Sequence, residues 1–84
     1  MKFDTIDKIG DSVIQHGVSN DRVYLMKLDS ANTNKILQYI HDLAVEKKYS
    51  KIFAKIPLAA GEAFIKAGYE KEAEISGFYK QEMD

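Results

Sequence analysis

The chain has 84 residues, a formal net charge of −1 and no cysteine, with 45% hydrophobic and 30% charged residues. This composition is that of one small globular domain, and it excludes disulfides, thiolate zinc sites and a cysteine nucleophile. Acidic and basic residues are balanced in both halves of the chain, so we expect no binding to nucleic acid. No apolar run approaches the ~20 residues of a membrane-spanning helix, so we expect a cytoplasmic protein that does not bind a membrane.

The first third of the chain predicts an irregular start followed by a β-hairpin. Residues 1–8 mix acids, lysines and single hydrophobic residues, which indicates a loosely held lead-in. Residues 9–28 predict the hairpin, because two β-rich stretches flank a polar turn at 17–21. Glycine and asparagine in that turn can adopt the positive φ that such loops need.

The second strand of this hairpin carries apolar residues on both faces. Val23 and Leu25 fall on one face, and Tyr24, Met26 and Leu28 fall on the other. A strand of this kind is usually covered on both sides. Helices of this chain can supply one cover, and we expect something outside the chain to supply the other.

Residues 30–49 predict an amphipathic helix. Its apolar residues recur at spacings of three and four, at Ile36, Leu37, Ile40, Leu43 and Ala44. Ser30 or Asn32 can cap its start, and lysines at 47 and 48 suit its C-terminal end, where the helix dipole favours cations.

The remaining elements are a strand, a short helix and a last strand. Residues 51–56 predict a strand that Pro57 ends, since proline cannot donate to a ladder. Residues 58–67 predict a helix, which must be held by packing because Gly61 within it costs about 1 kcal/mol relative to alanine. Gly68 fits the left-handed position after the helix.

Residues 70–79 predict a strand with one wet face. Three glutamates alternate there, at Glu70, Glu72 and Glu74. They could attract an ammonium group, or they could simply be solvated. The predicted order is therefore β-β-α-β-α-β, an α/β fold (α+β by some conventions) with a mixed sheet of about four strands and two packed helices in a single domain, 1–84.

Several segments of the chain have distinctive sequences. They are Ile9–Gly17, Asn20–Leu28, Lys51–Pro57, Phe64–Tyr69 and Ser76–Tyr79. Together they closely resemble the start of the β-lysine N-acetyltransferases, and the resemblance covers nearly the whole chain. It implies that the chain corresponds to the N-terminal region of such an enzyme, which makes a compatible solute by acetylating the side-chain amine of β-lysine.

The resemblance also implies a second domain. Acetyltransferases of the GNAT type bind acetyl-CoA through a Gln/Arg-x-x-Gly-x-Gly/Ala loop that opens a helix, and the helix–Gly-Tyr–strand ending of this chain is similar to the last part of such domains. The five glycines here lie too far apart to form that loop. We therefore expect that this chain binds no cofactor and is inactive alone. Its expected partner is a catalytic GNAT domain of the same protein, and that domain would bind acetyl-CoA.

The candidate site residues are few. His16 could contact substrate or accept a proton, or it could be a half-exposed residue that bonds the turn backbone. Asp21 and Arg22 could pair with the charges of β-lysine, or they could cap the turn and face solvent. We expect no catalytic residue and no metal site in the chain, and packing or rim positions for its five tyrosines.

A second hypothesis is a stand-alone, non-enzymatic interaction module. It would form a homodimer along a sheet edge with Tyr24, Met26 and Phe53 nearby. Binding of β-lysine would favour the enzyme-domain hypothesis, whereas a concentration-dependent mass would favour the module or an effect of truncation.

Overall fold

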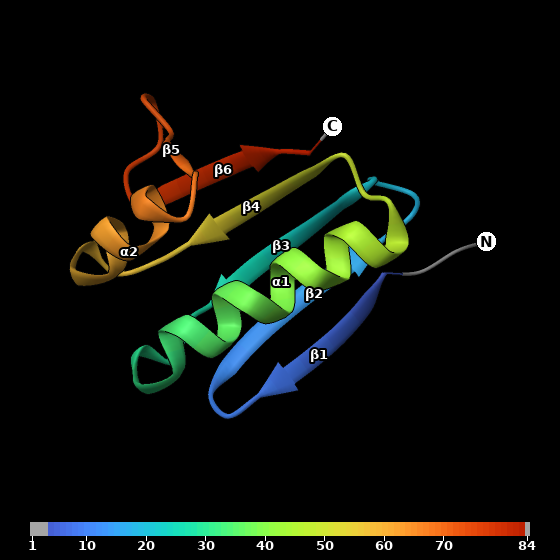
Figure 1. Cartoon of the computed structure of the whole chain (residues 1–84), viewed down its shortest axis with the longest axis horizontal. Helices are drawn as coiled ribbons and strands as arrows, with labels where there is room; N and C mark the ends of the chain where they lie inside the picture. The colour runs from blue at the N-terminus through green and yellow to red at the C-terminus, as the bar shows by residue number, and fades with distance from the viewer. Residues whose placement is uncertain (1–3, 84) are drawn as a thin grey trace.

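A six-stranded sheet forms the centre of the protein, with the strand order β1-β2-β3-β4-β6-β5 (Figure 1). The structure is a computed structural model that describes residues 4–83. Neighbouring strands are antiparallel except β3 and β4, which are parallel. The strands are β1 Thr5–Ile9, β2 Ser12–Gly17, β3 Arg22–Lys27, β4 Lys51–Lys55, β5 Glu70–Lys71 and β6 Phe78–Glu82.

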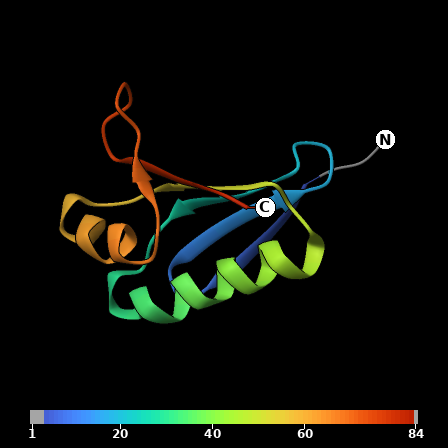
Figure 2. The ribbon, with the colours of Figure 1, turned by 45° about the horizontal axis from the view of Figure 1, so that its top comes forward.

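Both α-helices lie on one side of this sheet (Figure 2). The long helix α1 (Thr33–Lys47) connects β3 to β4, and the short helix α2 (Gly61–Lys66) connects β4 to β5. A 3-10 turn precedes each of them, at Ser30–Asn32 and Leu58–Ala60. Within residues 4–83 the opposite side of the sheet carries no helix. The fold is therefore a mixed α+β arrangement with one covered and one open sheet face.

The core fills the space between the sheet and α1. Successive side chains of a strand point to opposite faces, so alternate residues of the central strands enter it. Its fully buried members include Ile14, Val23, Leu25, Ile36, Ile40, Ile52, Ala54 and Phe64. The predicted apolar face of the long helix is confirmed, and so is the two-faced strand β4, with Ile52 inside and Phe53 outside. No helix within the described part of the chain is long and apolar enough to cross a membrane.

The predicted lead-in at residues 1–8 is wrong where the structure describes it. Residues 1–3 lie outside the described residues, but Thr5–Ile9 form strand β1, which pairs antiparallel with β2. Gly10 and Asp11 make the two-residue turn between these strands, and Gly10 has φ +58°. A Gly-Asp pair suits such a tight turn because glycine adopts positive φ without steric cost.

The single strand predicted over residues 70–79 is also wrong. It is divided into β5 and β6, and the segment between them is irregular. Gly77 turns the chain with φ +81°, and its carbonyl accepts a hydrogen bond from the Ile56 amide at 2.9 Å. This bond begins the pairing of β6 with β4, which continues to Glu82. Together with β1, this division raises the strand number from the predicted four to six.

The turn and cap residues differ partly from those predicted. In the β2–β3 loop Asp21, rather than glycine or asparagine, has positive φ (+53°). Neither predicted residue caps the long helix by its side chain; instead the carboxylate of Asp29 accepts a bond from the Ala31 amide at the 3-10 turn that leads into the helix. The left-handed position of Gly68 after α2 is confirmed, with φ +100°.

Candidate functional site

His16 lies in a hydrogen-bonded group of four side chains between the sheet and α1. Its Nδ1 is 2.9 Å from the Tyr49 hydroxyl, and its Nε2 is 3.1 Å from Oδ2 of Asp7. The Tyr39 hydroxyl donates to the same oxygen of Asp7 at 2.8 Å. These four residues, the His16 cluster, come from β2, β1, α1 and the segment after α1. Only 8% of His16 is exposed, so it is neither half-exposed nor bonded to the turn backbone.

The carboxylate of Asp7 lies at the centre of the His16 cluster. Its Oδ2 accepts from the Tyr39 hydroxyl and lies within hydrogen-bond distance of Nε2 of His16. Burial raises the pKa of the Tyr49 hydroxyl, and nearby carboxylates raise it further. Tyr49 therefore stays a neutral phenol, and its hydroxyl lies within hydrogen-bond distance of Nδ1 of His16. The cluster holds the histidine ring in one orientation and ties β1 to the helix layer.

Asp21 and Arg22 do not join this cluster. The Asp21 carboxylate accepts a bond from the Ser50 amide at 3.0 Å, and its carbonyl accepts one from the Ser50 hydroxyl at 3.2 Å. It thereby fastens the β2–β3 loop to the start of β4. Arg22 points to the open side of the sheet, because Val23 after it points into the core. The three predicted site residues thus have separate surroundings, and a substrate contact for any of them stays a prediction.

The open side of the sheet carries an aromatic group. We define the open face as the outward side chains of the three strands β3, β4 and β6: Arg22, Tyr24, Met26, Lys51, Phe53, Lys55, Phe78, Lys80 and Glu82. The Tyr24 and Phe78 rings stack with centroids 6.3 Å apart and planes 19° apart. The Arg22 guanidinium carbon lies 5.6 Å from the Tyr24 centroid and 5.8 Å from that of Phe53.

A shallow hollow of about 290 Å³ lies over these rings. Ile75, from the β5–β6 loop, completes its lining beside the aromatic residues and Arg22. The side chain of Ile75 is 52% exposed. The hollow is therefore mainly apolar, with one cation at its side.

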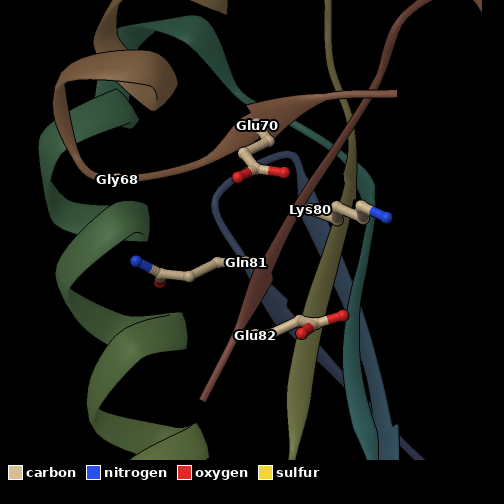
Figure 3. Close-up of a pocket in the computed structure, with 5 residues that line it drawn as sticks. All are labelled: Gly68, Glu70, Lys80, Gln81 and Glu82. Atoms are coloured by element: carbon tan, nitrogen blue, oxygen red, sulfur yellow. The ribbon is translucent and has the colours of Figure 1, made fainter. Parts of the chain in front are cut away.

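A second hollow, of about 280 Å³, lies beside β6 and is polar (Figure 3). Gln81 points from it toward the helices, where its Nε2 donates to the Ala67 carbonyl at 3.3 Å, while Lys80 points to the other side. The predicted row of glutamates does not form here: Glu70 lies in β5, whereas Glu72 follows the strand and its carboxylate is 3.9 Å from the Lys80 ammonium. This hollow is explained by contacts that hold the α2–β5 connection to the sheet.

Most residues of the His16 cluster and of the open face were not predicted as site residues from the sequence. Asp7 and Tyr39 reach His16 only through strand β1 and the helix packing, and the signal for β1 was the Gly10-Asp11 pair between alternating residues. The open face was partly visible, since Tyr24 and Phe53 were recognised on the faces opposite the core residues. Within residues 4–83 no group of three metal-ligating side chains gathers.

The geometry defines a small mixed α+β unit. Its buried polar side chains bond to one another, and within residues 4–83 no helix covers one face of its sheet. Over 80 residues, 95% of the chain, it is 35% identical to a β-lysine N(6)-acetyltransferase from Methanococcus maripaludis. The chain spans only 29% of that relative's length. No protein-family model matches the chain, and no solved structure matches it.

Proposed function

We propose that the chain is a non-catalytic region of a β-lysine N-acetyltransferase-like protein. The observation that carries the proposal is the 35% identity over 95% of the chain to an enzyme of that name. The whole protein would transfer acetyl from acetyl-CoA to the side-chain amine of β-lysine in the cytoplasm, producing a compatible solute. This region would correspond to its N-terminal part and would hold the interface to a catalytic GNAT domain.

The sheet supports a relation to the GNAT type. The parallel pair β3–β4 is joined by a long helix that crosses the sheet, and a second helix leads to a final antiparallel strand. This arrangement extends the helix–Gly-Tyr–strand pattern seen in the sequence. We propose that the region is a degenerate GNAT half.

The start of α1 does not fit the pyrophosphate of acetyl-CoA. Such a site needs free backbone N–H groups at a helix N-terminus. Here the 3-10 turn that leads into α1 is already capped by the Asp29 carboxylate, with bonds from the amides of Asp11 (3.2 Å) and Ala31 (3.1 Å) and the Asn32 side chain (3.1 Å). These bonds lower the pKa of Asp29, so a negative charge is already present beside the turn that leads into α1 and would repel a phosphate there. This supports a region without acetyl-CoA chemistry of its own.

A chimeric enzyme tests the proposed function. The 80 matched residues of the Methanococcus enzyme are replaced with those of this chain, and acetyl transfer from acetyl-CoA to β-lysine is measured by mass spectrometry. We expect transfer by the chimera and none by the 84-residue chain alone. The Methanococcus enzyme without the segment is the control. A folded but inactive chimera, or acetyl transfer by the isolated chain, would contradict the proposal.

The second candidate, a stand-alone homodimeric module, draws on a different edge from the one predicted. Tyr24, Met26 and Phe53 lie on interior strands, so they do not border an edge. Strand β1 does form an edge, and its Ile6 is 57% exposed. An exposed strand edge can pair with another copy. Sedimentation of the chain and of Ile6→Lys over a wide concentration range tests this: a monomer throughout would exclude it.

A further inference from the structure

We propose that the open face docks against an apolar surface with acidic surroundings in the remainder of the same polypeptide. The remainder is the part of the protein that corresponds to the Methanococcus relative outside the matched region. The inference rests on the proposed function and adds the surface by which this region would be held. More than two thirds of that relative lies outside the match, which is ample chain for a partner domain.

The centre of the open face has the composition of an interface core. Tyr24, Phe53 and Phe78 are half-buried by one another, and Met26 beside them is exposed. Aromatic residues, methionine and arginine are the types enriched at protein interfaces. The helices cover one face of the sheet. A face that a sheet leaves to solvent is normally polar, whereas this one carries three aromatic rings at its centre. A protein layer on the open face would complete the burial of these rings.

The charges of the open face select the kind of partner. Its outward positions carry four cations, Arg22, Lys51, Lys55 and Lys80, and one carboxylate, Glu82. Glu72, from the neighbouring loop, pairs with Lys80, and Glu70 lies opposite Lys80 on β5, so the positive excess is small and gathers on Arg22, Lys51 and Lys55. A second copy placed face to face would oppose like charges, which disfavours this contact. β-Lysine, with two amines and one carboxylate, is disfavoured for the same reason.

The ring geometry favours a protein over a single-stranded nucleic acid. Nucleic-acid platforms offer aromatic faces on which bases stack. On the open face, the Tyr24 and Phe78 rings stack on each other. The guanidinium of Arg22 lies over the rings of Tyr24 and Phe53. One face of each of these rings is therefore engaged within the sheet, which leaves less ring surface on which a base could stack.

Hydroxyl-radical footprinting of the chimeric enzyme tests the docking. Oxidation of Tyr24, Met26 and Phe53 is compared between the chimera and the free 84-residue chain by mass spectrometry. Because an interface core excludes water, we expect roughly fivefold slower oxidation of these residues in the chimera. Val45, exposed on the far side of α1, is the internal reference. An active chimera with equal oxidation of the open face in both samples would overturn the docking and leave the proposed function standing.

Charge reversal supplies matched variants. Lys51 and Lys55 flank Phe53 on β4. In the chimera, the double change Lys51→Glu and Lys55→Glu should restore most of the oxidation of the open face, because both charges then repel an acidic partner. Lys35→Glu with Lys71→Glu, an equal change of charge away from the open face, should leave the protection intact. Equal protection in the two double variants would overturn the role of charge. Circular dichroism of each variant confirms its folding.

The two other occupants are tested on the free chain. A labelled single-stranded oligonucleotide that binds the chain at physiological salt, and no longer binds Tyr24→Ala, would overturn the proposal in favour of nucleic acid. A concentration-dependent dimer whose open face becomes protected would overturn it in favour of a second copy. A monomer that does not bind the oligonucleotide supports it.

Discussion

The substitution Gly61→Ala should destabilise the protein although it places a better helix former in α2. The backbone of Gly61 is right-handed helical, with φ −58° and ψ −40°, so alanine adopts it without strain. Alanine would then stabilise an exposed helix by about 1 kcal/mol. Here its β-carbon would overlap with the Tyr79 hydroxyl and come within 3.1 Å of the ring carbon that carries it. Overpacking of this kind costs about 1–3 kcal/mol.

The net effect expected for Gly61→Ala is a loss of about 1 kcal/mol in the free energy of unfolding, because the overpacking exceeds the propensity gain. The Tyr79 ring cannot easily move, since it is 95% buried and packs against Phe64 with centroids 6.4 Å apart. In the Tyr79→Phe background the overlapping hydroxyl is absent. Alanine at position 61 should then be neutral or stabilising.

The wild type, Gly61→Ala, Tyr79→Phe and the double variant form a double-mutant cycle. Urea unfolding followed by circular dichroism measures the free energy of unfolding of all four. We expect a coupling free energy of about 1–2 kcal/mol between positions 61 and 79, in the range of residues in direct contact. Additive effects, or a wild-type background stabilised by Gly61→Ala, would refute the reasoning. Both results would mean that the Tyr79 hydroxyl does not lie over the helix start.

Three further predictions concern buried or bonded polar groups. Tyr69→Phe should stabilise the protein by about 1 kcal/mol at neutral pH, because within the described residues its buried hydroxyl has no hydrogen-bond partner. Burial raises the pKa of Tyr69, whereas the phenol of the unfolded chain ionises near pH 10. The free energy of unfolding should therefore fall as the pH rises above about 10, and it should fall less steeply in Tyr69→Phe. Equal pH dependence of the free energy of unfolding in the two proteins, measured by urea titration, would contradict this. Tyr49→Phe should cost about 1–3 kcal/mol in urea, since it leaves Nδ1 of buried His16 without its partner, while Tyr39→Phe, in a partly buried bond, should cost less. Asp29, whose pKa is lowered, should stabilise the fold above pH 3.8 and lose this contribution as the pH falls; a carboxyl-carbon NMR titration midpoint at or above 3.8 would refute it.

The helix and the central strands could be predicted because their patterns repeat. Ile36, Ile40 and Leu43 recur with the period of a helix, and the alternation of Ile52 and Phe53 marks a strand with two different faces. The failures occurred where a single glycine decides the path. Gly10 turns β1 back onto β2, and Gly77 separates β5 from β6. The spacing of apolar residues predicts neither turn.

The candidate site was less predictable than the fold because its members are far apart in sequence. The Tyr39 hydroxyl donates to Oδ2 of Asp7, yet 32 residues separate the two. His16 and Tyr49 are separated by 33 residues. Only the pairing of β1 with β2 and the crossing of α1 over the sheet bring these residues together. A sequence reading that lacked β1 could place His16 at a strand end but could not supply its partners.

The charge of the open face shows why balanced composition is a weak guide to partners. The sequence argued against nucleic acid because acidic and basic residues are nearly balanced in number, 13 and 12, but strand alternation sorts them by face. Arg22, Lys51 and Lys55 all occupy outward positions of β3 and β4, whereas Asp7 and Asp29 lie toward the helix layer or its start. A net charge of −1 thus coexists with a cationic sheet face. The prediction that the chain does not bind nucleic acid therefore cannot rest on the sum of charges, and the oligonucleotide experiment tests it.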